Sequence, residues 1–210
     1  QPKMVFLSFP SEYGTIYTKE ELSDISRVCR KYGLYLMVDG ARMGYGLGAE
    51  GNDVTLADIA AAADIFYIGG TKCGAMMGEA VVIVNEELKG HFRSYMKQNG
   101  GLLAKGWVLG LQFYTLFRDG TYFEITERAD RYAMEIRRAF AKKGIEVYID
   151  SPTNQQFLLL TEEQKELLGR NHIFENQFRM EDGRFCVRFC TSWSTEEADV
   201  QALLKDIRAL

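Results

Sequence analysis

The chain has 210 residues, of which 47% are hydrophobic and 26% are charged, a composition typical of soluble globular proteins. This length is sufficient for one large domain or two small ones. A net charge of −4 and a pI near 5.4 disfavour nucleic-acid binding and membrane-surface binding, which use basic patches. No apolar stretch reaches the length of a membrane-spanning helix.

The four cysteines are too few and too irregularly spaced to predict a disulfide framework or a zinc site. We therefore expect reduced thiols, a cytoplasmic location and no metal centre. The chain begins with Gln-Pro-Lys, without an initiator Met or a signal peptide. We interpret it as part of a longer protein.

The first third of the sequence predicts a β-α-β unit. A strand over about residues 3–9 precedes a helix that starts at Thr18, where Glu21 completes a capping box. The helix should end at Gly33, and a second strand covers residues 34–38. A helical connection of this kind predicts that the two strands are parallel.

The next segment predicts a short helix followed by a hairpin. Thr55 and Asp58 open an alanine-rich helix, and the apolar runs at 65–68 and 80–84 predict strands. The connection from Gly69 to Glu79 is too short for a helical crossover, so we expect an antiparallel return. The apolar character of these strands is typical of a sheet buried on both faces.

The rest of the chain predicts helices and then a small α+β unit. Residues 85–119 have a helical pattern interrupted at 99–101, and an amphipathic helix over about 122–143 should link two domains. We expect domains at 1–120 and 121–210. The later predicted elements are strands 145–149, 155–160, 173–180 and 184–191, a helix at 161–169, and a last helix capped by Ser194 with Glu197.

Asp39 and Lys72 are the first candidates for chemistry because each lies just past the end of a predicted strand. Adjacent strands would bring a carboxylate and an amine to one edge of the sheet, where open α/β sheets bind ligands. A pyridoxal phosphate (PLP) enzyme needs this pair: a lysine for the Schiff base and an aspartate for the pyridine nitrogen. The alternatives are a solvated lysine in a glycine-rich turn and a simple Asp-Gly turn.

Three motifs resemble the threonine aldolase and β-eliminating lyase group of fold type I PLP enzymes. They are Asp39-Gly40-Ala41-Arg42, Gly69-Gly70-Thr71-Lys72 and Gly78-Glu79-Ala80-Val81-Val82-Ile83. The resemblance covers nearly the whole chain and implies an α/β fold: an incomplete, mostly parallel large-domain sheet with helices and a small C-terminal α+β domain. It also implies an amino-acid substrate and a homodimer or homotetramer.

The resemblance implies roles for five residues. Lys72 would form the Schiff base with PLP, Asp39 would pair with the pyridine nitrogen and Ala41 would lie against the ring. Arg42 and Arg188 would bind the substrate carboxylate, which suits the rigid fork of a guanidinium. On an alternating strand Arg188 shares a face with Cys186 and Cys190, opposite Val187 and Phe189. The alternative for Arg188 is a surface ion pair.

Further assignments follow from position relative to the motifs. Lys97 precedes Gly100-Gly101, as does a family lysine that reaches a neighbouring subunit's active site, and Lys105 lies near a basic residue that meets the phosphate. For both, a solvated helix face is the alternative. Thr71 could contact the phosphate, and Glu12 lies where relatives hold the cofactor's O3′ region. Cys73 is expected to be a packing residue.

The phosphate-binding turn and the ring-stacking residue of the resembled family lie before the segment that this chain matches. We therefore expect the 210 residues alone to bind PLP poorly, to be inactive and to expose an apolar sheet edge and face. The leading hypothesis is cleavage of β-hydroxy-α-amino acids to glycine and an aldehyde. The alternatives are β-elimination, racemisation or a non-catalytic association fragment.

Overall fold

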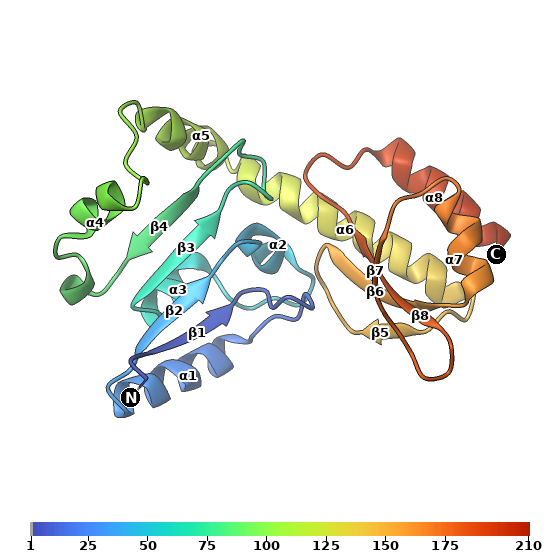
Figure 1. Cartoon of the computed structure of the whole chain (residues 1–210), viewed down its shortest axis with the longest axis horizontal. Helices are drawn as coiled ribbons and strands as arrows, with labels where there is room; N and C mark the ends of the chain where they lie inside the picture. Colours follow the sequence, from blue (N-terminus) through green and yellow to red (C-terminus); the bar gives the residue numbers. More distant parts are fainter. Residues whose placement is uncertain (1) are drawn as a thin grey trace.

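Two four-stranded sheets joined by one long helix form the computed structural model, which describes residues 2–210 (Figure 1). In the first sheet three parallel strands are followed by one antiparallel strand. Their order is that of the chain: β1 (Met4–Ser8), β2 (Tyr35–Asp39), β3 (Ile65–Gly69) and β4 (Glu79–Ile83). The parallel pairing and the antiparallel return predicted from connection lengths are both confirmed.

Three helices accompany the first sheet: α1 (Lys19–Lys31), α2 (Met43–Gly48) and α3 (Leu56–Ala62). Capping boxes begin α1 at Thr18 and α3 at Thr55, where the N-cap hydroxyl and the carboxylate of the third helical residue each bind the other's backbone amide. The capping box predicted for α1 is therefore confirmed. Leu36, Val38 and Phe66 point to the buried side of the sheet.

The segment expected to be helical over 85–119 forms three separate pieces. They are η1 (Glu86–Leu88), α4 (Phe92–Gln98) and α5 (Trp107–Arg118). The interruption predicted at 99–101 is present, because Gly100 adopts a positive φ of 79° and ends the helical path. The prediction was wrong in extent, since residues 101–106 also lie outside any helix.

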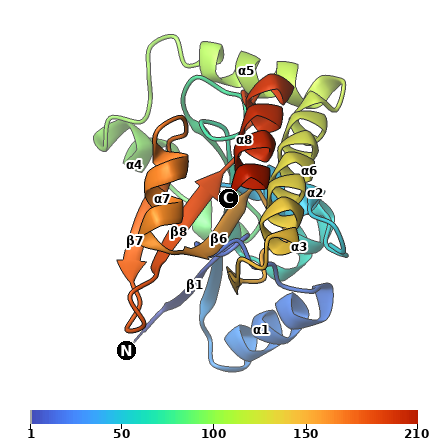
Figure 2. The ribbon, with the colours of Figure 1, turned by 90° about the vertical axis from the view of Figure 1, so that its right-hand side faces the viewer.

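Helix α6 (Thr121–Lys142) contributes to both cores. Its N-terminal half packs in the first core through Tyr122 and Ala129, and its C-terminal half packs in the second through Ile136 and Phe140. Figure 2 shows α6 and α8 side by side over the second sheet. The other elements of this part are β5 (Val147–Ile149), β6 (Gln155–Leu160), α7 (Glu162–Gly169), β7 (Glu175–Arg179), β8 (Phe185–Cys190) and α8 (Glu197–Ala209), with strand order β5-β6-β8-β7.

The capping box predicted at Ser194 is wrong. The N-cap of helix α8 is Glu196, two residues later, and it makes no side-chain capping hydrogen bond. The hydroxyls that could cap the helix are used in a turn of their own: Ser194 pairs with the Ser192 hydroxyl, and Thr195 accepts from the Ser192 amide. Local side-chain to backbone bonds of this kind compete with helix capping.

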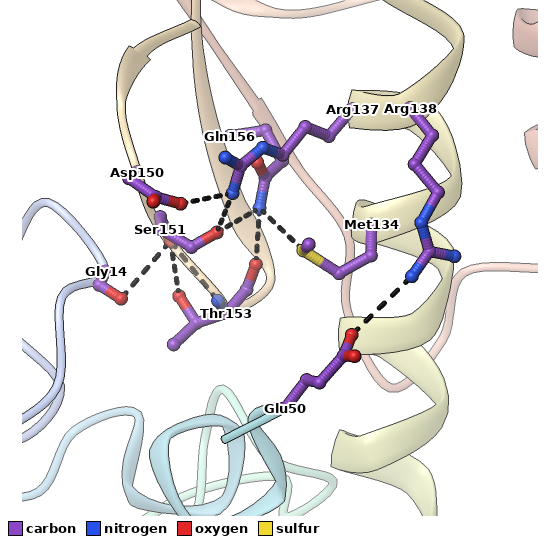
Figure 3. Close-up of polar contacts among 9 residues, drawn as sticks. All are labelled: Gly14, Glu50, Met134, Arg137, Arg138, Asp150, Ser151, Thr153 and Gln156. Carbon is purple, nitrogen blue, oxygen red and sulfur yellow. Dashed lines mark hydrogen bonds and ion pairs between the residues drawn. The ribbon is translucent and has the colours of Figure 1, made fainter. Parts of the chain in front are cut away.

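A buried polar junction connects the β1–α1 loop to the β5–β6 loop (Figure 3). The Ser151 hydroxyl donates to the Gly14 carbonyl at 3.2 Å, and the Gln156 amide donates to the carbonyls of Ser151 and Thr153. A Cβ on Gly14 would lie 2.2 Å from the Ser151 Oγ, and Gly14 has a φ of 77°. Glycine is therefore required where the two loops meet.

A buried carboxyl group lies beside this junction, on α6. Asp130 is 3% exposed. Burial raises its pKa to about 9, although the backbone amide of Asn154 favours the ionised form. The folded protein therefore keeps a proton on Asp130 at neutral pH, whereas the unfolded chain releases it.

One face of the first sheet is open to solvent. Phe6 is 58% and Val81 is 47% exposed, although both lie in strands. The expected burial on both faces is thus not found within residues 2–210, while the expected apolar exposure is confirmed. Within the same residues, no helix combines the length and the apolar character needed to cross a membrane.

We predict that the double substitution Phe6→Thr and Val81→Thr reduces aggregation of these 210 residues. Both side chains are already half exposed, so their removal costs little packing and diminishes an apolar patch. Binding of a hydrophobic dye and light scattering measure the effect. Leu36→Thr, on the buried face of the same sheet, is the matched control and should instead lower the free energy of unfolding by about 2–4 kcal/mol.

The second prediction concerns pH and Asp130. Because its folded-state pKa lies above its unfolded value, the contribution of Asp130 to stability is greatest at low pH and falls by up to about 1.4 kcal/mol per pH unit between about pH 5 and 9. Asp130→Asn should remove this contribution and stabilise the protein at pH 8, as measured by urea unfolding. Asp199→Asn, an exposed carboxylate in α8, should leave the slope unchanged. An unaltered slope in Asp130→Asn would contradict the assignment.

Candidate active site

Asp39 and Lys72 come from adjacent strands, as the sequence predicts. Asp39 is the last residue of β2, and β2 pairs with β3 in parallel, so both strands end at the same edge of the sheet. Lys72 follows β3 in the hairpin loop that returns to β4. The Lys72 side chain is exposed and Asp39 is half-buried.

The backbones that follow β2 and β3 are in direct contact. The Gly69 amide donates to the Gly40 carbonyl at 2.8 Å. A Cβ at Gly40 would lie 2.0 Å from the Tyr67 carbonyl oxygen, and one at Gly69 would lie 2.2 Å from the Ala41 carbonyl oxygen. Any larger residue at either position would separate the two loops, so these glycines keep the carboxylate and the amine at one edge.

Two buried tyrosines hold the first part of the loop that carries Lys72. The Tyr122 hydroxyl donates to the Gly69 carbonyl at 2.9 Å and accepts from the Gly44 amide at 3.1 Å. The Tyr45 hydroxyl donates to the Lys72 carbonyl and accepts from the Trp193 amide at 3.3 Å. Tyr45 thereby connects the lysine loop to the turn that follows β8.

Acidic and phenolic groups surround the two candidates. The Ala41 amide donates to Asp39 Oδ1 at 2.9 Å. Burial and a hydrogen bond with Asp39 raise the pKa of Tyr67. Glu79 accepts from the Gly70 amide at 3.1 Å; its burial raises its pKa, which this amide and Lys72 lower.

Both arginines that were predicted to bind a carboxylate are paired with glutamates. Arg42 Nη1 lies 3.7 Å from Glu12 Oε2, and Arg188 Nη2 contacts Glu175 Oε2. The alternative interpretation of Arg188, an ion pair, is therefore observed, although the Arg188 side chain is largely buried rather than at the surface. Its predicted neighbours are confirmed, because Val187 and Phe189 are core residues on the opposite face.

The basic residues of the two sheets converge near Cys190. Burial of its thiol raises the pKa of Cys190, whereas Arg42, Arg188 and Lys72 all lower it. The two arginines are also linked by contacts, because Gln155 binds Arg188 and the Glu12 carbonyl, and the Glu12 carboxylate pairs with Arg42. Cys73 is fully buried, and burial raises its pKa to about 11, as expected for a packing residue.

The side chains of the other residues that the sequence predicts for the site take no part in the hydrogen bonds and ion pairs described above. Thr71, Lys97 and Lys105 are exposed, and Ala41 is half-buried beside Asp39. Within residues 2–210 no hydrogen bond or ion pair connects the side chain of Lys97 or Lys105 to the site. Their predicted roles stay predictions.

Sequence reasoning missed the residues that support the site. Tyr45, Tyr122 and Gln155 are buried polar side chains whose partners are backbone carbonyls far away in the chain. No local pattern signals such contacts. Tyr67 could have been found, because it alternates with Phe66 and Ile68 and so faces the same side of the sheet as Asp39.

The chain is similar in sequence and in structure to known proteins. The model of the β-eliminating lyase family matches residues 1–181. Low specificity L-threonine aldolases from Pseudomonas sp. (strain NCIMB 10558) and Pseudomonas aeruginosa are 33% and 31% identical over 100% and 99% of this chain. A solved structure of Leishmania major threonine aldolase is 41% identical, with a TM-score of 0.97 over 99% of this chain and 61% of its own.

The fold is that of PLP-dependent transferase-like proteins, and a PLP-bound putative aminotransferase from Clostridium difficile 630 shares it at 14% identity with a TM-score of 0.70. The chain belongs to the β-eliminating lyase family. It spans about 60% of the length of the curated relatives that it matches.

We predict that Tyr45→Phe and Tyr122→Phe each lower the free energy of unfolding by about 1–3 kcal/mol. Each change leaves a backbone amide and a carbonyl without their hydroxyl partner, in buried bonds for Tyr122 and in part-buried bonds for Tyr45. Urea unfolding measures the loss. Tyr32→Phe, an exposed tyrosine at the end of α1, is the control and should change stability by less than about 0.5 kcal/mol. Equal effects for all three variants would contradict a role in holding the loop.

Proposed function

We propose that the intact protein is a PLP-dependent carbon–carbon lyase of the threonine aldolase type. Its substrates would be β-hydroxy-α-amino acids, which it would cleave to glycine and an aldehyde. The observation that carries the proposal is the adjacency of Asp39 and Lys72 at one edge of the sheet, together with Arg42 and Arg188, which are linked through Glu12 and Gln155. The similarity to threonine aldolases supports the choice of reaction.

The residues present fit this cofactor. An exposed amine and a half-buried carboxylate lie at one edge, and a backbone contact that excludes side chains holds their two loops together. Lys72 would hold the cofactor through its amine, Asp39 would keep the pyridine nitrogen protonated and Ala41 would lie against the ring. Thr71 and Lys105 would contact the phosphate. When bound, PLP supplies an acceptor for the electrons of the bond that breaks at the substrate Cα.

The chain's own residues would bind and orient the substrate. Arg42 and Arg188 would hold its carboxylate through guanidinium hydrogen bonds. Fixing the carboxylate on one side sets which bond at Cα is aligned for cleavage. Glu12 and Glu175 balance the charge of the arginines in the absence of substrate. The side chain of Lys97 would reach the active site of a neighbouring subunit.

The cofactor assignment predicts a lysine-dependent absorbance change. The intact protein mixed with PLP should develop the visible band that the cofactor acquires when a lysine amine holds it, and Lys72→Ala should abolish this band. Lys89→Ala, another exposed lysine, is the control and should keep it. A band that persists in Lys72→Ala would refute the proposal.

Release of glycine rather than pyruvate from a β-hydroxy-α-amino acid distinguishes the aldolase reaction from β-elimination.

We further propose that the protein is a homodimer or homotetramer that associates through α5. Trp107, Leu111 and Tyr114 are exposed at helical spacing on one face of this helix, which is typical of interaction surfaces. The same helix touches the lysine loop, because Gln112 Oε1 accepts from the Met76 amide at 2.7 Å. Association would therefore also steady the loop.

The four free cysteines support a reducing, cytoplasmic location.

The association surface predicts a specific disruption. Leu111→Asp places a charge in the centre of the exposed apolar face and should shift the intact protein toward the monomer, as measured by light scattering after size exclusion. Leu167→Asp, on an exposed position of α7, is the control and should leave the oligomer intact. If neither variant dissociates the oligomer, α5 is excluded as the contact between subunits.

A further inference from the structure

Arg188 lies in a row of side chains on one face of the second sheet. In the antiparallel register it is opposite Phe157 of β6 and Glu175 of β7, and Gln155 is opposite Cys190. Residues that are opposite each other in antiparallel strands place their side chains on the same face. Gln155, Arg188 and Glu175 therefore share one face of the sheet, with Glu175 directly opposite Arg188 and Gln155 diagonal to it.

The guanidinium of Arg188 has a different environment at each nitrogen. Nη1 donates to Gln155 Oε1 at 2.9 Å, and Nη2 contacts Glu175 Oε2. Nε is buried and has no hydrogen-bond partner within the described residues. Gln155 is fully buried, whereas the Glu175 side chain is 57% exposed. The arginine is thus held firmly on one side and loosely on the other.

Gln155 also links Arg188 to the other predicted carboxylate-binding arginine. Its Nε2 donates to the Glu12 carbonyl at 3.2 Å, and the Glu12 carboxylate pairs with Arg42. A buried amide with one donor bond and one acceptor bond has a defined orientation. The side chain of Gln155 therefore fixes Arg188 of the second sheet relative to the β1–α1 loop of the first.

We propose that Gln155 is a positioning residue that aims Arg188 at a ligand carboxylate, and that Glu175 occupies the place of that carboxylate until the ligand replaces it. This inference depends on the proposed function, because it takes Arg188 as the receptor of an amino-acid carboxylate. Its ligand class is a small molecule with a free α-carboxylate.

The pattern of hydrogen bonds favours such a replacement. A carboxylate that binds side-on uses Nε and Nη2 together, and this two-point geometry is stronger than a single contact. Glu175 satisfies Nη2 and leaves Nε without a partner. Because Glu175 is mostly exposed, its ion pair contributes little stability. A ligand carboxylate that satisfies both nitrogens should therefore displace Glu175 while Gln155 keeps Nη1.

The first experiment compares glycine with methylamine, which differs from it by the carboxylate. Binding of each to the intact, PLP-loaded protein is measured by titration calorimetry. Glu175→Gln removes the competing charge at nearly constant size and should strengthen glycine binding by about two- to fivefold, the range set by an exposed ion pair. Methylamine binding should not change. Glu146→Gln, which removes one carboxylate of an ion pair in the same part of the molecule, is the matched control and should affect neither.

The second experiment tests Gln155. Gln155→Leu removes the acceptor for Nη1 and should weaken glycine binding at least tenfold, with methylamine binding preserved. If this variant does not fold, Gln155→Glu keeps an acceptor but adds a second internal carboxylate. It should also weaken glycine binding selectively. Equal losses for glycine and methylamine would show a general structural role and overturn the proposal.

Arg188→Lys separates this inference from the proposed function. If it weakens glycine binding while Glu175→Gln has no effect, Arg188 is the receptor but Glu175 is not a stand-in, and the inference is overturned alone. If the wild-type protein does not bind glycine, or if Arg188→Lys binds it equally well, both the inference and the role of Arg188 are overturned.

Discussion

The contact between the backbones of Gly40 and Gly69 is the constraint on which the candidate site depends. It joins the ends of β2 and β3 at a distance that leaves no space for a side chain. The carboxylate of Asp39 and the loop of Lys72 are positioned by this contact, since Asp39 ends β2 and the loop follows β3. Tyr122 and Tyr45 then anchor the first part of the loop, at Gly69 and at Lys72. The chemistry attributed to the edge therefore depends first on main-chain packing.

A second constraint operates between the two sheets. The substrate-binding function proposed for Arg188 requires that the second sheet be fixed relative to the first. Buried amides and hydroxyls supply this fixation. Gln155 binds the Glu12 carbonyl. Ser151 binds the Gly14 carbonyl (Figure 3). Buried hydrogen bonds specify geometry well, because a buried polar group that loses its partner costs much free energy. The β1–α1 loop is the common partner of both contacts.

Much of the fold could be predicted from local patterns. The capping box at Thr18 and the short connection from Gly69 to Glu79 each encode a structural feature within a few residues, and both were confirmed. The prediction at Ser194 failed because neighbouring hydroxyls satisfied one another instead of the helix. Among site residues, Asp39 and Lys72 could be found because strand ends are visible in sequence. Gln155 and Glu175 could not, because their partners lie on other strands or in a distant loop.

Helix α6 has a mechanical consequence for the whole molecule. Its 22 residues extend about 33 Å and carry core side chains of the two largest hydrophobic clusters. Neither cluster can lose its structure without exposing one half of this helix and weakening the other. The two sheets should consequently melt as one cooperative unit, and any change in the angle between them would have to bend the helix or move its ends within the cores. The distance between Arg188 and Lys72 is thus set by how α6 joins the two cores, and not by local contacts alone.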